Sequence, residues 1–518
     1  MQPAPGTRPP ADPTPIESDA RRLAAGLQKR KYLFLLLFTI LYAFGAALHA
    51  RSKPLWFDEI ITVIAASPSD AATAWRAAHE CDASPPLPHM LTHYSMQWFG
   101  PGELAIRLPA IAGFWIFCLC LFAFTRRLGI YYSFLAMLLP VATAAYNYAY
   151  EARAYGLELA FCGLALVAWQ TAAGDRRRWL ASAGIAVSLM GAILCHYYAL
   201  LLYIPLVGAE AYRSWRARRI EWPIWLAFAL GGVPLIWRLA SISGVVQHFS
   251  HGTWSPAYPE QVVEFWEIGL QHTLSFLVLG LAFMAVWMLG RHAPPDAAAE
   301  PSTLAPHELV AAILFLAVPV AAVAGGLLVT HMFTDRYAIF ALTGAVILGA
   351  AMAARLSGGR ALPGFLLLCL AVVPLAFVTW EVPPRHNPFA DEPLLVEALR
   401  KGPVVVPDAQ LFLQMWQYAP APLKSKILFL ADNASATKYL GFDALDGGLR
   451  VLRPWSSVQV LEYGDFAVPG REFLVYQNSL RPGWLLARVM ADGASADVQA
   501  FTNYRQLFRV KLAAEQPR

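Results

Sequence analysis

Long apolar runs separated by short polar loops fill the first three quarters of the chain. Runs of roughly 17 to 25 apolar residues are long enough to cross a bilayer as helices. We predict eleven such helices, near residues 32–50, 108–125, 131–149, 155–173, 180–195, 197–212, 223–241, 267–290, 309–330, 337–354 and 362–380. The pattern therefore predicts a polytopic α-helical membrane protein.

Two further stretches are predicted to lie beside the bilayer. Residues 1–31 begin with a segment rich in Pro, Ala and Asp, which predicts a disordered cytoplasmic tail. Residues 51–107 form an external loop that is too polar at its start to span a membrane. After the break at Ser84–Leu87, apolar residues recur at helical spacing between Met90 and Phe99. This spacing predicts a helix that lies flat in the membrane interface.

Hydropathy falls after Trp380, and the remaining chain alternates short β-rich runs with helical segments. We predict an α/β domain over residues 390–518, outside the membrane because an odd number of spans precedes it. Asp408 and Asp432 follow two predicted strands, where ligand sites often lie. No Gly-rich phosphate loop follows either strand, so we interpret both as turn residues.

Composition supports the membrane assignment. Of the 518 residues, 57% are hydrophobic and only 14% are charged, which excludes an ordinary soluble protein. All of the 6 cysteines except Cys81 fall in apolar runs, and their spacing predicts neither a disulfide framework nor a zinc site. The cytoplasmic loops are short and basic and hold no nucleotide fold, and we expect no nucleic-acid partner.

Positive charges separate by alternate loops. The basic loops are cytoplasmic by the positive-inside rule, and they contain Arg126–Arg127, Arg176–Arg178, Arg213 to Arg219, Arg291 and Arg355 to Arg360. The opposite loops are external. They contain four polar elements, which are Asp58–Glu59, Ser84–Leu87 followed by Gly102–Pro109, Tyr150–Tyr155, and Thr334–Tyr337.

These four elements, in this order, resemble the C superfamily of lipid-linked-sugar glycosyltransferases. The similar branch holds protein O-mannosyltransferases, the aminoarabinose transferase of lipid A and the rhizobial lipid A galacturonosyltransferases. That branch has an Asp-Glu pair in the first external loop, a His-Pro-Pro-Leu-like segment, an Arg-Leu-Pro at the second span, a Glu-Ala-Arg-x-Tyr stretch and a late Arg-Tyr. The resemblance covers residues 32–380. It implies a GT-C-like domain of about 11 transmembrane helices, followed here by an extracytoplasmic α/β domain.

For the acid pair, the resemblance implies catalytic roles. Asp58 would be the general base, and Glu59 would orient the acceptor, the sugar or a metal. The alternative is that the pair caps the external helix that follows it. We favour the catalytic interpretation, because a cap needs one acid and not two beside apolar Trp56 and Phe57.

Three arginines on the external side are candidates for holding the donor phosphate. Arg107, Arg153 and Arg336, the last with Tyr337, lie where the positive-inside rule disfavours arginine. The alternative is anchoring at the interface. The supporting positions are Pro85, Pro86, Glu151 as an ion-pair partner of an arginine, Tyr155, and His196 with Tyr197 as cavity lining or interfacial belt residues.

One position departs from the family pattern. Ser84 stands where the family has a histidine, and His89 and His93 follow one and two turns later. The role of the family's histidine is therefore in doubt here, or has moved.

No cofactor is certain, and a divalent metal is the one candidate. His248 and His251 are weak ligand candidates together with Asp58 or Glu59, because the His-x-x-His spacing lacks further ligands. We interpret their loop instead as a lid over the cavity, with Trp254 at the interface.

The required chemistry agrees with the resemblance. Transfer from a polyprenyl phosphate sugar needs a base for the acceptor's proton and cations for the leaving phosphate. We therefore predict an inverting glycosyltransferase, a hexosyl or pentosyl transferase, that modifies an envelope lipid, glycan or protein. It would span a bacterial inner membrane with its site facing the periplasm. The alternatives are a membrane transporter or lipid flippase, which would need ionisable groups at mid-membrane, and a non-catalytic envelope assembly protein.

Overall fold

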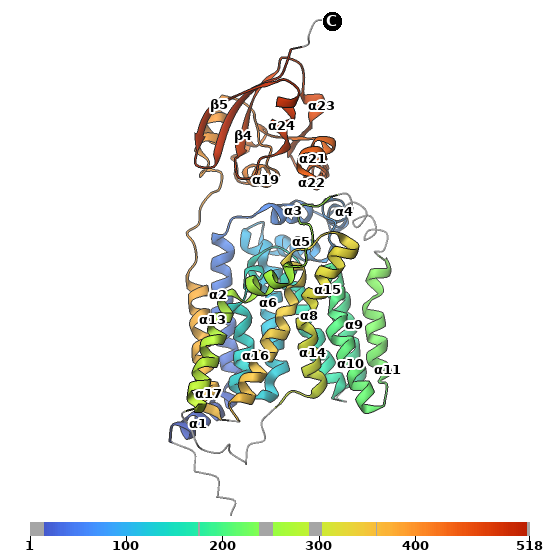
Figure 1. Ribbon diagram of the computed structural model, residues 1–518, viewed down its shortest axis with the longest axis vertical. Helices are drawn as coiled ribbons and strands as arrows, with labels where there is room; N and C mark the ends of the chain where they lie inside the picture. The colour runs from blue at the N-terminus through green and yellow to red at the C-terminus, as the bar shows by residue number, and fades with distance from the viewer. Residues whose placement is uncertain (1–14, 175–176, 238–251, 290–302, 359, 515–518) are drawn as a thin grey trace, which may run out of the picture.

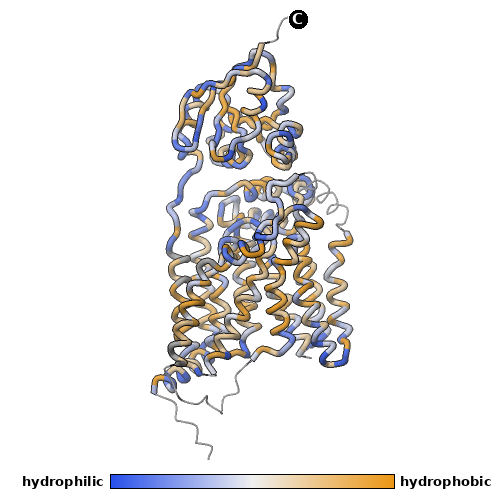
Figure 2. The backbone as a smooth tube through the Cα atoms, viewed as in Figure 1, coloured by the Kyte–Doolittle hydropathy of each residue, from blue (hydrophilic) through white to orange (hydrophobic). Residues whose placement is uncertain are grey.

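The chain folds into a helical bundle with a smaller α/β domain at one end (Figure 1). The computed structural model describes residues 15–174, 177–237, 252–289, 303–358 and 360–514. Hydrophobic residues dominate the helices of the bundle, whereas the C-terminal domain is mixed in hydropathy (Figure 2). This arrangement confirms the predicted helical membrane part and C-terminal sheet domain.

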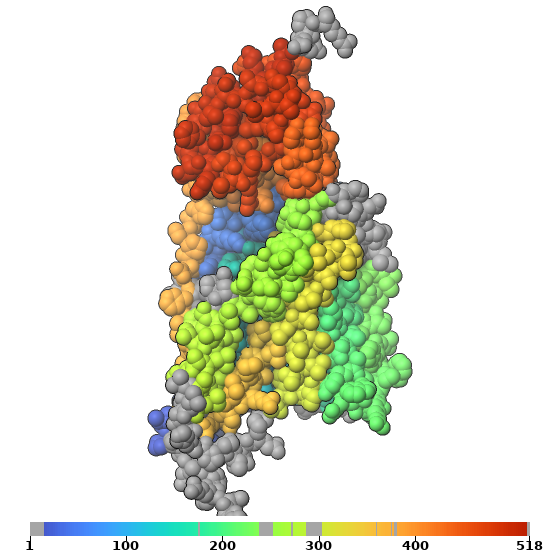
Figure 3. All heavy atoms as spheres, viewed as in Figure 1, coloured from blue at the N-terminus to red at the C-terminus, as the bar shows by residue number. Residues whose placement is uncertain are grey.

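The bundle is made of α-helices of varied length and of short 3-10 or π segments between some of them. Its helices are α1 (Pro15–Lys29), α2 (Lys31–Ser52), α6 (Glu103–Thr125), α7 (Ile130–Leu138), α8 (Tyr155–Ala173), α9 (Arg178–Cys195), α10 (Tyr203–Ala217), α11 (Trp222–Gly231), α13 (Gln261–Leu289), α14 (Pro306–Leu316), α15 (Val318–Gly325), α16 (Leu342–Leu356) and α17 (Ala361–Trp380). The short segments are η1 (Arg126–Leu128), η2 (Leu139–Ala142), η3 (Ala144–Tyr150), η4 (Tyr197–Leu202), η5 (Gly326–Thr330) and η6 (Asp335–Ala341). In Figure 3, α13 crosses the visible face of the bundle obliquely beside α14 and α15.

The predicted count of eleven spans is not confirmed. Among the described residues, 5 helices are long and apolar enough to cross a membrane, or up to 7 if each of two bent pairs is one span. The bent pairs are Gln261–Leu270 with Thr273–Ala285, at 71°, and Pro306–Leu316 with Val318–Thr330, at 40°. Shorter apolar helices occupy three other predicted spans, at Ile130–Ala142, Trp222–Trp237 and Ala361–Phe377. The predicted span at 197–212 is divided between η4 and α10.

Glycines let α6 and α8 pack closely. A Cβ on Gly113 of α6 would lie 2.5 Å from the carbonyl oxygen of Gly156, and one on Gly156 of α8 would lie 2.6 Å from that of Ala110. Small residues at such positions let helix backbones approach each other, as is typical of helices packed within a membrane. This contact places the start of α8, and Arg153 just before it, beside α6.

The external loop folds into three helices at the bundle end that faces the C-terminal domain (Figure 1). They are α3 (Phe57–Ala66), α4 (Ala71–Cys81) and α5 (Leu87–Phe99). The helix expected between Met90 and Phe99 is thus present as part of α5. It buries His89 and His93 and exposes Tyr94 and Trp98. Outward-facing aromatic side chains are those expected of a helix at a membrane interface.

The prediction of a disordered tail over residues 1–31 is wrong for residues 15–29, which form α1; residues 1–14 lie outside the described part. The carboxylate of Glu17 accepts hydrogen bonds from the backbone N–H groups of Ala361, at 2.7 Å, and Leu362, at 3.0 Å, where α17 begins. Tyr131 of α7 donates to the carbonyl oxygen of Ala20 at 2.8 Å. These distant partners stabilise a helix that local composition does not predict.

The C-terminal domain is a single twisted sheet with helices packed on it. Its strands are β1 (Val404–Val405), β2 (Ile427–Ala431), β3 (Gln459–Glu462), β4 (Glu472–Asn478), β5 (Ser495–Thr502) and β6 (Arg505–Lys511), in the order β3-β2-β1-β4-β6-β5. Strands β1 to β4 are parallel, and β6 and β5 are antiparallel. Its helical segments are α18 (Pro393–Lys401), α19 (Ala409–Tyr418), α20 (Ala421–Lys424), α21 (Asn433–Leu440), α22 (Ala444–Arg450), η7 (Arg453–Trp455), α23 (Tyr463–Phe466) and α24 (Trp484–Ala491).

The two aspartates at strand ends are helix caps. Asp408 accepts from the N–H groups of Gln410 and Leu411 in α19, and Asp432 accepts from that of Ala434 in α21. Their side chains are thus used to start helices. This agrees with the interpretation of both residues as places where the chain turns.

The C-terminal domain rests on the segment that leads into α3. The hydroxyl of Tyr418 accepts a hydrogen bond from the N–H of Leu55 at 2.6 Å and donates to Glu103 at 3.1 Å. Gln414 donates to the carbonyl oxygen of Leu55 at 3.1 Å. Phe57 and neighbouring apolar residues of α3 share one buried cluster with this domain. The domain therefore packs directly against the chain beside the acid pair.

We predict that Gly156→Ala destabilises the bundle, because its Cβ would meet the backbone of α6. Overpacking of this kind costs roughly 1–3 kcal/mol. The matched control is Gly102→Ala, since a Cβ there meets nothing within 4 Å. Thermal unfolding in detergent should show a lower midpoint for Gly156→Ala alone; equal midpoints for both variants would contradict the close packing of α6 and α8.

Candidate active site

Asp58 lies in the first turn of α3, and its carboxylate faces two arginines. Oδ2 of Asp58 lies 3.2 Å from Nη1 of Arg336 and 3.7 Å from Nε of Arg153. Arg336 comes from η6, and Arg153 from the loop before α8. Three predicted external elements, far apart in sequence, therefore meet at one carboxylate.

A second acid, Asp82, completes this cluster and was not predicted. Its Oδ2 lies 3.2 Å from Nη1 of Arg153 and 3.3 Å from Nε2 of His89, and its Oδ1 accepts from the N–H of Ser84 at 2.9 Å. Burial opposes its ionisation, but His89 and Arg153 hold the pKa of Asp82 well below its ordinary value. Asp82 is therefore a carboxylate that shares Arg153 with Asp58. The sequence signal that could have identified Asp82 is its place two residues before Ser84, together with His89 in the first turn of the next helix.

These groups line a cavity of about 230 Å³. The lining residues are Asp58, Asp82, Ala83, Ser84, Pro85, Arg153, His196, Tyr197, Tyr198, Trp254, Thr330, Met332, Arg336 and Tyr337. Seven predicted site residues are among them. Pro86 and Tyr155 are buried beside the cavity and do not line it.

Both arginines in the cavity retain unused donors. Nε of Arg153 and Nε of Arg336 are buried, and neither has a hydrogen-bond acceptor among the described residues. Unpaired buried N–H groups are costly, so these donors favour an anionic ligand. The guanidinium of Arg336 also lies over the rings of Trp56, at 5.5 Å, and Trp254, at 5.6 Å, which hold it in place.

One side of the cavity is aromatic. The ring of Tyr337 lies 4.9 Å from that of His196 and 4.7 Å from that of Tyr198. Burial, with Arg153 and Arg336 nearby, lowers the pKa of His196 to about 3. The Nδ1 atom accepts a hydrogen bond from the N–H of Tyr198 at 3.3 Å. His196 is therefore neutral and carries its proton on Nε2.

Arg107 was expected to bind phosphate, but the structure uses it differently. It is fully buried, and its side chain forms five hydrogen bonds within the protein. Two go to Glu59, at 2.7 and 2.6 Å, and three go to the carbonyl oxygens of Ala50, Lys53 and Pro54. All of its N–H groups are thereby satisfied, so none remains for a ligand.

Glu59 was expected to orient a substrate or metal, and it also lies outside the cavity lining. Its side chain is fully buried against Arg107 and accepts from the N–H of Ala152 at 2.7 Å. Trp56 is the N-cap of α3, and Glu59 accepts a hydrogen bond from the N–H of Trp56 at 3.4 Å. The capping alternative for the acid pair therefore holds for Glu59 and not for Asp58. The two adjacent acids therefore point to different partners.

Glu151 was expected to pair with an external arginine, but it pairs with Lys53. Burial raises the pKa of Glu151 above its ordinary value, with Lys53 acting in the opposite direction. His93 is likewise structural, because its Nδ1 lies 3.0 Å from the carbonyl oxygen of Ala66. Neither residue lines the cavity.

The candidate metal ligands His248 and His251 lie outside the described residues. Within the described residues, no group of three or more His, Cys, Asp and Glu side chains is placed to hold a metal ion. The two acids that line the cavity, Asp58 and Asp82, both contact Arg153.

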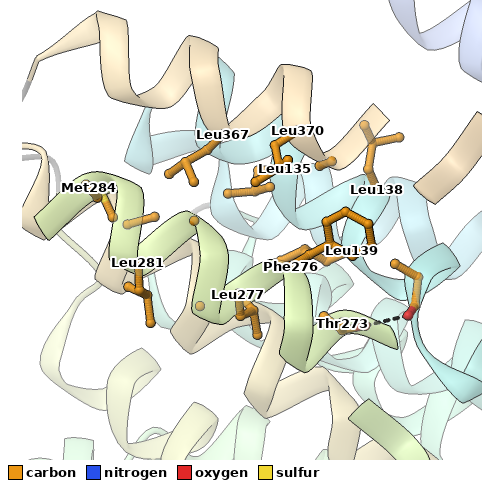
Figure 4. A pocket seen from close by; sticks show the side chains of 15 residues that line it. Leu135, Leu138, Leu139, Thr273, Phe276, Leu277, Leu281, Met284, Leu367 and Leu370 are labelled. Carbon is orange, nitrogen blue, oxygen red and sulfur yellow. Dashed lines mark hydrogen bonds between the residues drawn. The ribbon is translucent and has the colours of Figure 1, made fainter. Parts of the chain in front are cut away.

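A separate apolar cavity of about 50 Å³ lies within the bundle (Figure 4). Side chains of α7, α13, α16 and α17 line it, together with residues of η2. All are apolar except Thr273, whose hydroxyl donates to the carbonyl oxygen of Ala142. This cavity suits a hydrocarbon chain rather than a polar ligand.

The fold is similar to that of solved structures of ArnT from Cupriavidus metallidurans, a lipid A aminoarabinose transferase. The apo structure has a TM-score of 0.54 at 13% identity, over 93% of this chain and 98% of ArnT. The structure bound to undecaprenyl phosphate has a TM-score of 0.51 at 12% identity, over the same shares. No protein-family model matches the chain, and no curated protein matches its sequence. The structural similarities show that the chain shares the fold of these ArnT structures.

We predict that Arg107→Met unfolds more readily than the native protein, because it leaves the Glu59 carboxylate buried without its counter-ion. Breaking a buried pair in this way costs about 3 to 5 kcal/mol. Asp58→Asn is the control, since Asp58 faces the cavity. The thermal midpoint in detergent should fall for Arg107→Met and stay near the native value for Asp58→Asn; a native-like midpoint for Arg107→Met would contradict the structural role.

We predict that the free energy of unfolding decreases as the pH is lowered, because His196 is neutral in the folded protein. The pKa of His196 is about 3 in the folded protein against an ordinary value of 6.5, so only the unfolded chain takes up this proton between those pH values. The folded state then loses about 1.4 kcal/mol per pH unit below pH 6.5, as far as pH 3. Comparing thermal midpoints at pH 7 and pH 5 should show a smaller fall for His196→Gln; parallel falls would contradict this assignment.

Proposed function

We propose that this chain is an inverting glycosyltransferase, which moves a sugar from a polyprenyl phosphate donor to an envelope lipid, glycan or protein. The observation that carries the proposal is the cavity in which Asp58 lies between Arg153 and Arg336. The fold shared with ArnT, which has been solved with undecaprenyl phosphate, supports the same class of donor for this chain.

In the proposed reaction Asp58 acts as the general base. It takes the proton of an acceptor hydroxyl as that oxygen forms a bond to the anomeric carbon. The bond from this carbon to the phosphate oxygen breaks on the opposite face, and its electron pair leaves with the phosphate. A single displacement of this kind inverts the anomeric centre.

The arginines would stabilise the charge that grows on the leaving phosphate. The free Nε donors of Arg153 and Arg336 are available to phosphate oxygens, and donors held in place before the reaction lower its barrier. Arg336 forms an ion pair with Asp58. A bound phosphate would compete for this arginine and release the Asp58 carboxylate for its role as base.

Asp82 is proposed as a positioning residue. It is ionised and lies 3.2 Å from Nη1 of Arg153, whereas Asp58 lies 3.7 Å from Nε of the same guanidinium. This contact fixes the direction in which Arg153 presents its remaining donor. His89 in turn lies against the Asp82 carboxylate, so a histidine after the Pro-Pro segment supports the site indirectly.

We further propose that the cavity faces the periplasm of a bacterial inner membrane. Helix α3, which carries Asp58, lies at the bundle end next to the C-terminal domain, away from the predicted cytoplasmic loops (Figure 1). The apolar cavity beside Thr273 would accept part of the donor's isoprenoid chain. We do not favour a transporter, because the cluster of charged groups gathers at this end rather than midway along the bundle.

We predict that Asp58→Asn lowers transfer activity by about 10³-fold, because an amide cannot take the acceptor's proton. The readout is the mass profile of envelope glycans and lipid A in a strain that lacks the native gene and carries the variant. The native chain should restore a mass that deletion removes, and the mass difference would identify the sugar.

The matched control is Asp70→Asn, which changes another external acid. Asp70 caps α4 by accepting from the N–H of Thr73, and asparagine caps helices equally well. It should restore the native profile. If Asp58→Asn also restored the native mass profile, Asp58 would not be the base, and the interpretation as a non-catalytic envelope assembly protein would be favoured.

A further inference from the structure

A second cavity, whose lining combines cationic and apolar side chains, lies at the opposite end of the bundle from the C-terminal domain. It has a volume of about 530 Å³, and its walls come from α1, the start of α2, α7 and α17. Three cationic residues, Arg22, Lys29 and Arg30, line it together with apolar side chains that include Leu27 and Phe365. It shares no residue with the candidate active site.

The cavity exists because α1 is fixed against the bundle. Glu17 binds the backbone at the start of α17, and Tyr131 binds the backbone of α1 at Ala20. The chain then turns at Arg30 into α2, which leaves a hollow between the two helices and α17. Its shape is therefore built by specific contacts and does not depend on a bound molecule.

The charge of the cavity favours an anion. Lys29 and Arg30 have no carboxylate partner among the described residues, whereas Arg22 lies 2.9 Å from Asp19. No side chain in the described part caps the N-terminus of α2, whose backbone N–H groups and helix dipole also attract negative charge. A phosphate group at this turn would meet both the cations and these donors.

The apolar side of the cavity opens outward. Leu23 is 55% exposed and Phe34 is 40% exposed, and both line it. A free phosphate would leave these apolar surfaces uncovered, whereas an acyl chain would cover them. The ligand that fits is thus an amphiphile with an anionic head.

We propose that this cavity binds an anionic glycerophospholipid of the surrounding membrane. Its phosphodiester lies against Arg22, Lys29 and Arg30, and an acyl chain runs along Leu27 and Phe34. Clusters of cations at the membrane surface attract anionic lipids, and the cavity restricts that attraction to a defined place. This proposal does not depend on the transferase activity.

The test uses the full chain in nanodiscs of phosphatidylcholine with or without phosphatidylglycerol. Native mass spectrometry counts retained phosphatidylglycerol, and the thermal midpoint reports its binding. The native chain should retain this lipid and melt higher in its presence. The variant Arg22→Gln/Lys29→Gln/Arg30→Gln should bind it about 10-fold more weakly or worse, given the attraction that each cation contributes.

Two matched variants distinguish specific binding of the lipid in the cavity from non-specific electrostatic attraction of anionic lipid to the protein surface. Arg126→Gln/Arg216→Gln/Arg218→Gln removes the same charge from exposed arginines that do not line the cavity, and should bind like the native chain. Gly26→Phe keeps every charge and fills the cavity, because a Cβ on Gly26 meets nothing within 4 Å. It should lose the lipid while α1 stays folded, so the proposal stays testable if the triple variant of cavity cations fails to fold.

Three results would overturn the proposal. Equal loss in both triple variants would mean non-specific attraction, and native binding by Gly26→Phe would mean that the cavity is not used. A thermal shift produced equally by glycerol phosphate, which has no acyl chains, would mean that the site takes a free anion.

Discussion

The buried pair of Glu59 and Arg107 is the interaction on which the external end of the bundle depends. Removing two charges from water is expensive, and this geometry offsets the cost with a bidentate contact and further hydrogen bonds on both partners. Those bonds reach the end of α2, the start of α3, α6 and the segment at Ala152. Four stretches of chain therefore converge on one ion pair, and Asp58 is the next residue along from it.

The arginines of the external end fall into two sets, according to whether all of their N–H groups have acceptors within the protein, and each of the two adjacent acids faces a different set. Arg107 is saturated by protein acceptors, whereas Arg153 and Arg336 each keep a buried donor without one. Glu59 faces the saturated arginine, and Asp58 faces the two that are not. A side chain whose hydrogen-bonding groups all have protein partners can only stabilise the fold. A side chain with a donor that has no partner can bind a ligand. Adjacent residues in one motif can thus have unrelated roles.

The sequence predicted which residues would meet at the candidate active site, but not which acid would pair with which arginine. Asp58, Arg153, Arg336, Tyr337 and His196 were all named from their external position and family pattern, and they do meet in one cavity. The order of residues along the chain does not show whether every N–H group of an arginine has a protein acceptor, because the acceptors are carbonyl oxygens of other segments. The assignment of Arg107 as a phosphate ligand failed for that reason.

Tertiary context explains the other differences. Asp82 was missed because its partners, Arg153 and His89, are assembled only by the fold. Helix α1 was missed because Glu17 and Tyr131 stabilise it across long sequence separations. The helical periodicity was read correctly, but apolar length alone does not reveal bends such as the 71° bend in α13. Local pattern therefore predicted elements better than it predicted how many of them cross a bilayer.

The contact made by Tyr418 argues that the C-terminal domain is part of the framework of the site. Its hydroxyl joins Leu55, three residues before Asp58, to Glu103, which lies one helical turn before Arg107 on α6. One side chain of the domain thus touches the chain on both sides of the buried ion pair. Because the ion pair and Tyr418 constrain the same short segment, a change in how the domain docks would be transmitted to the position of Asp58. The domain also lies at the bundle end that carries α3, so a molecule that approaches the cavity from that end would pass it (Figure 1).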